Sequence, residues 1–191
     1  MTQLLRSYLF PVMWLAYIPY WWAMAANVKE TKRRESVWPR VPRQLLLICA
    51  ILLLALPRFP FPFLNARFLP LGDWSYWTGA AITVVGLLFS VWARRHLGTN
   101  WSQAVTLKQD HELITSGPYA LVRHPIYTGL LLALFGSAIA RGQWRGLLAV
   151  LIVFGVLWQK LRLEEKFMRT QFGESYETYS RRVAALVPYI I

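Results

Sequence analysis

Residues 116–129 read SGPYALVRHPIYTG, and this stretch joins two apolar segments through a tight turn, a basic pair and the start of a helix. The Gly-Pro pair near its beginning predicts the turn, because glycine adopts positive φ and proline fixes its own φ. Pro125 predicts the first position of a helix, where no backbone N–H donor is needed. The free N–H groups of that helix start, beside Arg123, His124 and Tyr127, suit a polar or anionic ligand group. A loop that only caps a transmembrane helix is the competing interpretation.

The composition favours a membrane protein built as one domain. The chain has 191 residues, of which 56% are hydrophobic, with ten Trp, nine Tyr and ten Phe. So many aromatic side chains are difficult to bury in a soluble fold of this size, whereas a bilayer and its two interfaces accept them readily. The single cysteine, Cys49, cannot form an internal disulfide. We therefore expect one domain over residues 1–191, integral to a membrane.

Five apolar segments predict an all-α, polytopic helical membrane bundle. A helix of about 20 residues crosses the roughly 30 Å hydrocarbon core of a bilayer, and most of these segments approach that length. Tryptophans at the ends of the third segment are typical of interfacial anchors. The predicted spans are 8–27, 44–58, 74–93, 125–140 and 144–163.

The distribution of positive charge predicts the orientation in the membrane. With five spans, one side receives loops 28–43 and 94–124 and the tail from Lys160 onward, which together carry 16 of the 21 Lys and Arg residues. The positive-inside rule therefore places the N-terminus outside and the C-terminus in the cytoplasm. Eight of the nine acidic residues fall on the same cytoplasmic side. The net charge of +12 is thus explained by topology and attraction to anionic lipid, and no nucleic-acid partner is expected.

Ionisable side chains at the end of the fifth span are the first candidates for chemistry. Lys160 and Glu164 share a helix face at i, i+4, and Glu164 and Glu165 follow directly after the apolar run. Ionisable residues at membrane depth are functional candidates by default, although an ordinary solvated helix end is the alternative. Farther along, Tyr176 and Tyr179 recur at helical spacing, which predicts a packing stripe.

The sequence lacks the motifs of several common enzyme classes. It has no Walker A motif, no Rossmann GxGxxG and no GxSxG elbow, and the glycines within the apolar segments are isolated. His96, His111 and His124 lack the close spacing of a zinc site, and the one cysteine is remote from them. Catalysis through a metal ion or a covalent enzyme intermediate is therefore not expected.

Four motifs in a fixed order resemble the isoprenylcysteine carboxyl methyltransferase family, which is related to the phospholipid N-methyltransferases. They are GPYALVRHPIYTG at 117–129, the Glu164-Glu165 pair, FGESYETYSRRV at 172–183 and Val187-Pro188. The resemblance covers roughly residues 101–188, and the ordered set is specific. It implies a compact helical membrane fold that binds S-adenosylmethionine (SAM) at the cytoplasmic face, in the regions 94–128 and 160–188.

The resemblance also implies which residues touch the cofactor and the substrate. Glu164 falls on the family's cofactor-binding glutamate, and Lys160, one helical turn earlier, falls on its substrate-binding arginine. A lysine lacks the bidentate carboxylate clamp of a guanidinium, so Arg162 is a second candidate for that role. The implied cofactor-binding residues are His111, Glu112, Leu113, Ile114, Tyr119, His124, Pro125, Ile126, Tyr127 and Glu164.

Methyl transfer from a sulfonium asks the protein chiefly to align donor and acceptor and to exclude water. A carboxylate acceptor is already ionised at neutral pH, whereas an amine or thiol must first lose a proton. The hypothesis is therefore methylation of the carboxylate of a prenylcysteine-like lipid. Glu164 would pair with the amino group of SAM, and residues 111–127 would enclose its adenosine and carboxylate. Lys160 or Arg162 would steer the anionic head of a substrate whose lipid tail arrives laterally from the bilayer.

Several other functions stay open at this point. Phospholipid N-methylation and methylation of a small thiol would use the same cofactor. NADPH-dependent sterol reductases carry a similar RHPxYxG stretch, but they usually place an acidic residue directly after the glycine, where this chain has Leu130. A non-catalytic scaffold or transporter would leave the clustered polar residues without a role, and transporters usually show internal repeats. The expected setting is a prokaryotic cell membrane, with lipids around the chain and no obligate protein partner.

Overall fold

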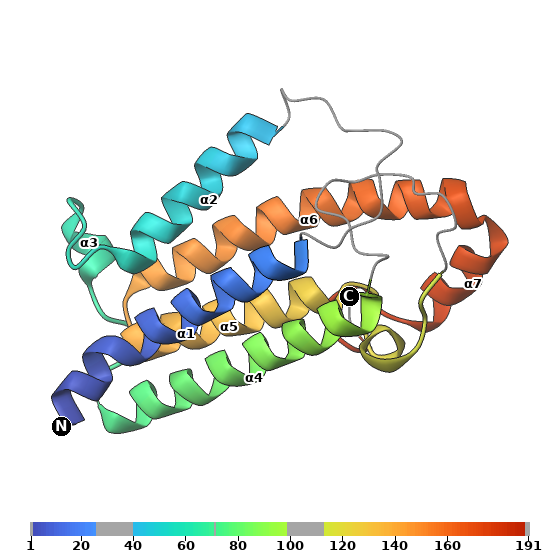
Figure 1. The fold of residues 1–191 in the computed structure, drawn as a ribbon. Coiled ribbons are helices and arrows are strands. Elements are labelled where there is room, and N and C mark those ends of the chain that lie inside the picture. The colour runs from blue at the N-terminus through green and yellow to red at the C-terminus, as the bar shows by residue number, and fades with distance from the viewer. Residues whose placement is uncertain (1, 26–39, 71, 99–112, 190–191) are drawn as a thin grey trace.

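The computed structural model describes residues 2–25, 40–70, 72–98 and 113–189, whose secondary structure is helical (Figure 1). The long helices are α1 (Thr2–Ala25), α2 (Arg40–Ala55), α4 (Asp73–Leu97), α5 (Pro125–Arg141) and α6 (Trp144–Phe172). Three short elements are α3 (Pro62–Asn65), the 3₁₀-helix η2 (Gly117–Ala120) and α7 (Glu174–Arg182). These described ranges contain no β-strand, and one isolated bridge joins Arg67 to Gln143. The predicted all-α fold is confirmed.

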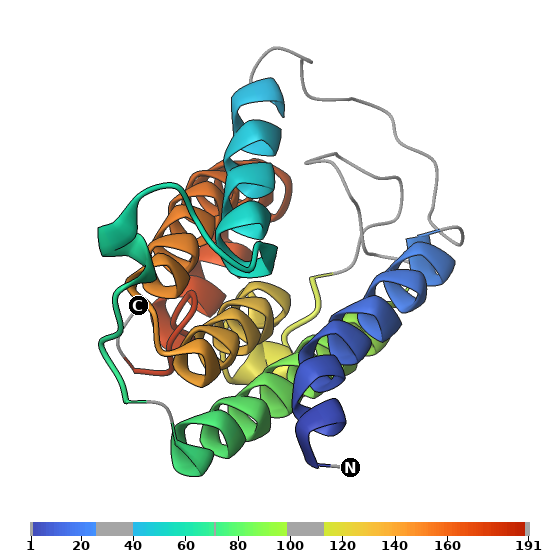
Figure 2. The ribbon, with the colours of Figure 1, turned by 90° about the vertical axis from the view of Figure 1, so that its left-hand side faces the viewer.

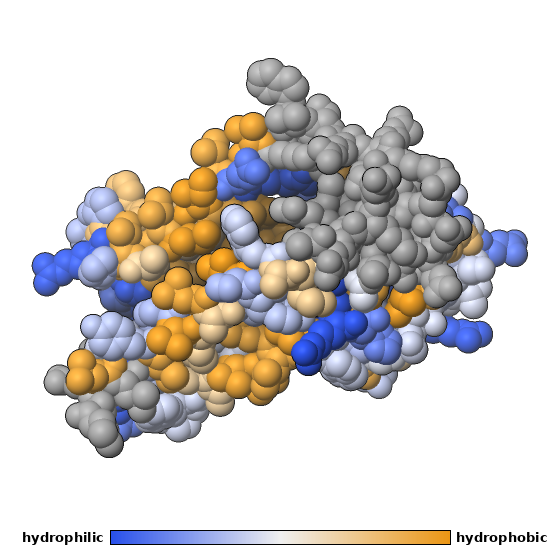
Figure 3. Space-filling view, viewed as in Figure 1, coloured by the Kyte–Doolittle hydropathy of each residue, from blue (hydrophilic) through white to orange (hydrophobic). Residues whose placement is uncertain are grey.

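Each of the five long helices overlaps one of the five predicted apolar segments, although α1 and α2 begin earlier and α6 ends later than predicted. By length and composition, α4 and α6 are long and apolar enough to cross a membrane, whereas α2 and α5 are shorter apolar helices. Figures 1 and 2 show the long helices running alongside one another, with α1 next to α4 and α2 next to α6. Helix α6 extends beyond the others at the end that carries α7. Hydrophobic residues cover much of the visible face of this bundle (Figure 3).

Helices α4 and α5 pack backbone against backbone through two pairs of glycines. A side-chain carbon at Gly79 would come within 2.5 Å of the carbonyl oxygen of Gly136, and one at Gly86 within 2.5 Å of the carbonyl oxygen of Gly129. Between these pairs, Thr83 Oγ1 donates a hydrogen bond of 3.1 Å to a carbonyl of α5. Small residues allow this close approach where lipid supplies no hydrophobic drive between helices. Glycines that are isolated in the sequence are therefore paired in space.

Helix α1 packs on α4 and α5 through aromatic side chains with polar tips. Trp14 Nε1 donates to Ser137 Oγ at 3.2 Å. The hydroxyls of Tyr17 and Ser90 share a hydrogen bond of 3.0 Å. Polar groups inside an apolar bundle need such partners, and these bonds fix which face of α1 turns inward.

Helices α2 and α6 share an apolar core. Its members lie at helical spacing on both helices, so one stripe of α2 meets one stripe of α6. The buried residues of this core on the two helices are Ala50, Leu53, Ala149, Val153 and Leu157.

At the end of the bundle away from α7, two arginines bind carbonyls at and just after the end of α2. Arg145 is 1% exposed, and it donates to the carbonyls of Leu56 at 2.7 Å and Pro57 at 3.0 Å. Arg141 donates to the carbonyl of Leu54 and, at 2.9 Å, to that of Leu56. The last carbonyls of a helix lack intrahelical partners and carry partial negative charge. The two guanidinium groups therefore cap α2 and fasten it to the α5–α6 turn.

Candidate active site

The stretch 116–129 folds at one end of the bundle, among the last turn of α4, the charged end of α6, and α7. Gly117 has a φ of +59°, in the left-handed region, and a side-chain carbon there would come within 2.7 Å of the His96 ring. The η2 turn follows, and Pro125 is the first residue of α5. The predicted turn and helix start are both confirmed.

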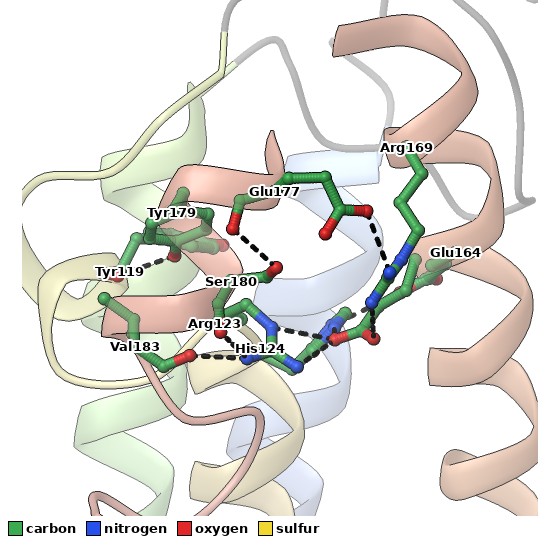
Figure 4. A network of polar contacts seen from close by, with 10 residues as sticks. Tyr119, Arg123, His124, Glu164, Arg169, Glu177, Tyr179, Ser180 and Val183 are labelled. Carbon is green, nitrogen blue, oxygen red and sulfur yellow. Dashed lines mark hydrogen bonds and ion pairs between the residues drawn. The ribbon is translucent and has the colours of Figure 1, made fainter. Parts of the chain in front are cut away.

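Arg123 fastens this stretch to α6 and to the chain that leaves α7 (Figure 4). Its guanidinium donates to Glu165 Oε1 from Nε at 2.8 Å and from Nη2 at 2.6 Å. Nη1 donates to the carbonyl of Ser180 at 3.0 Å and to that of Val183. One side chain therefore holds three parts of the chain together, which gives Arg123 a structural role.

The chain after α7 docks on the start of α5 through its backbone. The N–H groups of Arg123 and His124 donate to consecutive carbonyls beginning at Ala184, at 2.8 and 3.0 Å. The Thr128 hydroxyl donates to the next carbonyl along at 2.7 Å. These bonds explain why the SRRV motif lies beside the RHP motif although some 60 residues separate them.

The tyrosines of α7 pack inward, as their spacing predicts. Tyr176 and Tyr179 are 2% and 9% exposed. The Tyr179 hydroxyl donates to the carbonyl of Tyr119 at 2.6 Å. Burial raises the pKa of Tyr179 to about 12, against an opposing effect of the nearby Arg123 guanidinium. The phenol therefore stays protonated and holds the η2 turn against α7.

Glu165 lies just beyond the apolar part of α6, and its partners hold it ionised. Burial alone would raise the pKa of this carboxyl, but the neighbouring His124 and Arg123 outweigh that effect and lower the pKa to about 2. Arg169 places Nη2 3.8 Å from Glu165 Oε2, and its Nη1 donates to Glu177 at 2.9 Å. Glu165 is thus the anion at the centre of an ion-pair network that joins α5, α6 and α7.

Glu164 faces a different set of side chains. The Tyr127 hydroxyl donates to Glu164 Oε1 at 2.6 Å. Lys160 Nζ lies 3.8 Å from the same oxygen and 5.5 Å from the centre of the Tyr127 ring. The rings of His124 and Tyr127 stack in parallel with their centres 5.6 Å apart. Four residues that the sequence analysis singled out therefore meet in one cluster. This Glu164 cluster consists of His124, Tyr127, Lys160 and Glu164.

The imidazole of His124 lies between the two carboxylates. Its Nδ1 is 3.6 Å from Glu164 Oε2, and its Nε2 is 3.4 Å from Glu165 Oε1. Nε2 is buried, and within the described residues it has no hydrogen-bond partner of good geometry. Since both separations exceed an ordinary hydrogen bond, the contacts are electrostatic, and they couple the structural network to the Glu164 cluster.

The other described residues of the predicted cofactor set lie close to this cluster. Pro125 is buried and Ile126 half-buried in the first turn of α5. A small cavity of about 50 Å³ lies between α6, α7 and the chain just before η2. Its lining includes Leu113, Ile114, Tyr119 and His124.

The side chains around Glu164 fit the charged groups of SAM. A carboxylate suits its ammonium group, and the stacked rings of His124 and Tyr127 suit its sulfonium, because cations bind to aromatic faces. The neighbouring apolar side chains suit an adenine ring. Two predicted cofactor residues, His111 and Glu112, lie outside the described residues.

The two candidate cations point to different sides of α6. Residues two positions apart on an α-helix are separated by about 200° around its axis, so Arg162 and Glu164 face different ways. The Arg162 guanidinium lies 6.0 Å from the centre of the Trp158 ring. The cluster around Glu164 and Tyr127 therefore contains Lys160 and not Arg162.

Arg43, near the start of α2, is a further basic side chain whose charge acts on this cluster, and it was not among the predicted site residues. Leu47 and Ala50 follow it at i+4 and i+7, and they belong to the core against which Tyr127 packs. Arg43 is half-buried, and its charge acts on the Tyr127 hydroxyl. The helical spacing from Arg43 to the apolar stripe is the signal that could have identified it.

Comparison with known proteins places these features in a family. The profile of the phospholipid methyltransferase family matches residues 74–175. Protein-S-isoprenylcysteine O-methyltransferase of Schizosaccharomyces pombe is 35% identical over 99 residues, which are 49% of this chain and 41% of that protein. The probable protein-S-isoprenylcysteine O-methyltransferase of Oryza sativa subsp. indica is 28% identical over 122 residues, 60% of this chain and 64% of that protein. These matches confirm the predicted family resemblance.

Two further similarities extend over most of the chain. The cobalt-zinc-cadmium resistance protein CzcN of Cupriavidus metallidurans is 29% identical over 160 residues, 83% of this chain and 65% of that protein. The solved structure of the eukaryotic intramembrane Ras methyltransferase ICMT superposes with a TM-score of 0.61 at 23% identity, over 82% of this chain and 55% of that one. The fold is therefore shared. The chain spans less than two thirds of the length of each of the two curated methyltransferases above.

Proposed function

The chain belongs to the phospholipid methyltransferase family, and we propose that it is a SAM-dependent membrane methyltransferase that acts on the carboxylate of a prenylcysteine-like lipid. The observation that carries this proposal is the Glu164 cluster. A carboxylate, two stacked aromatic rings and a lysine meet at the point where the apolar part of α6 ends. This set can bind a sulfonium-bearing amino acid beside an anionic acceptor.

In the proposed topology, α1, α2, α4, α5 and α6 each cross the membrane, with the N-terminus outside and the C-terminus in the cytoplasm. The charge distribution supports this orientation, since 16 of the 21 Lys and Arg residues fall on the cytoplasmic side. Two arginines of the opposite side, Arg141 and Arg145, are bound to carbonyls of the α2 end, which accounts for positive charge there. The Glu164 cluster then lies at the cytoplasmic face.

The proposed cofactor contacts follow from the chemistry of each side chain. SAM, when bound, supplies a methyl group on a positively charged sulfur that needs no further activation. Glu164 would hold the ammonium group, while Tyr127, through its hydrogen bond to Glu164, fixes the orientation of that carboxylate. The His124 ring would present an aromatic face to the sulfonium. The Leu113 and Ile114 side chains would give the adenosine an apolar wall and exclude water.

The positive charge of the site favours an anionic acceptor. Lys160 lies 5.5 Å from the centre of the Tyr127 ring, and the charge of Arg43 acts on the Tyr127 hydroxyl, so an acceptor carboxylate would be attracted by two cations. The carboxylate is ionised at neutral pH and needs no base, and the protein has only to align it with the methyl group. The lipid tail would lie in the bilayer beside the helices. Phospholipid N-methylation is the second candidate, favoured by the family profile, but its amine would meet repulsion from the same two cations.

Calorimetric titration of the detergent-purified protein with S-adenosylhomocysteine, the demethylated product of SAM, and separately with NADPH tests the cofactor. We expect saturable binding of the methionine-derived ligand, lost in Glu164→Gln and His124→Ala. Glu174→Gln is the matched control, because it removes an exposed carboxylate of α7 far from the cluster. Binding of NADPH alone would assign the chain to the reductases, and binding of neither ligand would contradict the enzyme proposal.

An acceptor screen then tests the substrate class. The screen compares N-acetyl-S-farnesylcysteine with phosphatidylethanolamine, using SAM labelled in its methyl group. Base-labile label on the farnesylated cysteine marks a methyl ester and supports the proposal. Label on phosphatidylethanolamine alone would establish the second candidate instead.

A further inference from the structure

A second, larger depression lies on another side of α6 from the Glu164 cluster. It is an open groove of about 660 Å³ between α6, the end of α7 and residues 183–189. Trp158, Arg162 and Glu165 line it from α6, at helical positions i, i+4 and i+7. Neither Lys160 nor Glu164 contributes to the groove, so it is distinct from the candidate active site.

The groove is lined by both apolar and basic side chains. Leu121 and Trp158 contribute apolar surface, whereas Leu161 and Ala185 beneath them are almost fully buried. Arg181 and Arg182, at the end of α7, lie on the rim with Arg162. A surface of this kind suits a molecule with an apolar body and an anionic head.

The three rim arginines lack the ion pairs that three other cations at this end of the bundle make. Lys160, Arg123 and Arg169 each have a carboxylate within 4 Å. Among the described residues, no carboxylate makes an ion pair with Arg162, Arg181 or Arg182. Glu165, the acid that lines the groove, is already bound by Arg123. The rim thus presents three guanidinium groups whose charge no carboxylate of the described residues neutralises.

The position of the groove along α6 matches the depth of lipid headgroups. In the proposed topology the apolar part of α6 ends at residue 163, and Trp158 and Arg162 lie within its last two turns. Tryptophan is enriched at this depth, and arginine there extends its head towards the interface. Guanidinium groups bind phosphate oxygens in a bidentate manner.

We propose that this groove binds an anionic phospholipid of the cytoplasmic leaflet. Arg162, Arg181 and Arg182 hold the headgroup phosphate, and an acyl chain follows Trp158 and Leu121. The lipid is a bound partner of the fold and not a methyl acceptor. The inference shares the membrane orientation with the proposed function but not its cofactor or substrate.

Native mass spectrometry of the full chain in detergent tests the proposal. The protein is titrated with dioleoyl phosphatidylglycerol or dioleoyl phosphatidylcholine, and lipid-bound species are counted. We expect a preference for phosphatidylglycerol that falls about fivefold per guanidinium removed, hence more than tenfold in Arg181→Gln/Arg182→Gln. Arg95→Gln, which removes an exposed arginine from the same end of the bundle, leaves the preference unchanged.

Further controls separate loss of lipid binding from misfolding of the variant, and a lipid site from a site for a free anion. Arg181→Lys/Arg182→Lys keeps the charge and retains most of the preference. Thermal unfolding of the Gln variant in detergent at the temperature of the parent protein reports an intact fold independently of the lipid and of any cofactor. Equal binding of the two lipids, or an unchanged preference in the Gln variant, would overturn the proposal. Displacement of the lipid by millimolar inorganic phosphate alone would show a site for a free anion instead.

Discussion

Glu165→Gln removes the anion from the network around Arg123, and we expect it to destabilise the fold more than any other single carboxylate substitution at this end. Glu165 is 10% exposed on its side chain and receives two hydrogen bonds from Arg123. A pKa of about 2, against an ordinary value of 4.5, corresponds to about 3 kcal/mol of stabilisation. Loss of one partner from a buried ion pair costs a similar 3–5 kcal/mol or so.

Thermal unfolding in detergent, followed by circular dichroism at neutral pH, measures this effect. On the scale of soluble domains of this size, about 3 kcal/mol lowers Tm by about 6–12 °C. Glu164→Gln, at a partly exposed carboxylate held chiefly by Tyr127, costs about 1 kcal/mol and a correspondingly smaller shift. If Glu165→Gln unfolds within 2 °C of the parent protein, the reasoning about the network is wrong.

The pH dependence of stability gives the same reasoning an independent check. The pKa of Glu165 is lower in the folded chain than in the unfolded chain, so its contribution is complete above about pH 4.5. That contribution declines as the pH falls towards 2, because protonation then favours the unfolded chain. The parent protein therefore loses stability over this interval, and Glu165→Gln shows a flatter profile there.

Three further predictions concern the packing of α4 on α5 and the two cations Lys160 and Arg43. Gly86→Ala forces a methyl group to within 2.4 Å of the α5 backbone, and we expect it to lower the stability by about 3 kcal/mol in the same unfolding assay. Gly155→Ala is the control, because open space surrounds Gly155, and it is neutral or slightly stabilising. Lys160→Ala raises the KM for a carboxylate acceptor about tenfold and Lys160→Arg restores it, as measured by methyl-ester formation. Arg43→Gln raises the same KM by a similar factor and leaves the calorimetric affinity for S-adenosylhomocysteine unchanged; a weaker affinity would place Arg43 at the cofactor instead.

Local patterns in the sequence were enough to predict the helices and much of the candidate site. Apolar segments of membrane length fold as helices whatever their neighbours do, because only a helix satisfies the backbone of a single segment in lipid. The i, i+4 spacing put Lys160 and Glu164 on one face, and Pro125 started α5 as expected. The proximity of His124 to Glu164 was expected only because the family resemblance assigned both residues to the same cofactor site.

The features that were missed depend on which helices become neighbours. Gly79 and Gly86 carry meaning only once α5 is known to run antiparallel beside α4, so that Gly136 and Gly129 face them. Arg43 lies more than 80 residues from Tyr127 in sequence. Its helical spacing predicts that it shares a face of α2 with the apolar stripe, but not that this face packs near α5. The same limit applies to Arg141 and Arg145, which the sequence shows only as positive charges on the outer side. In the fold they bind carbonyls at the end of α2.

The docking of the chain after α7 on the start of α5 sets an order of assembly during synthesis. The N–H groups of Arg123 and His124 donate to the carbonyls of Ala184 and Ala185. The ribosome adds these two alanines some 60 residues after Arg123 and His124. The apolar helices are inserted while the ribosome is still adding these residues, so the imidazole and guanidinium reach their final positions only as the C-terminal segment leaves the exit tunnel. The candidate site is therefore completed late in synthesis, in a step that a nascent chain stalled before residue 183 cannot complete.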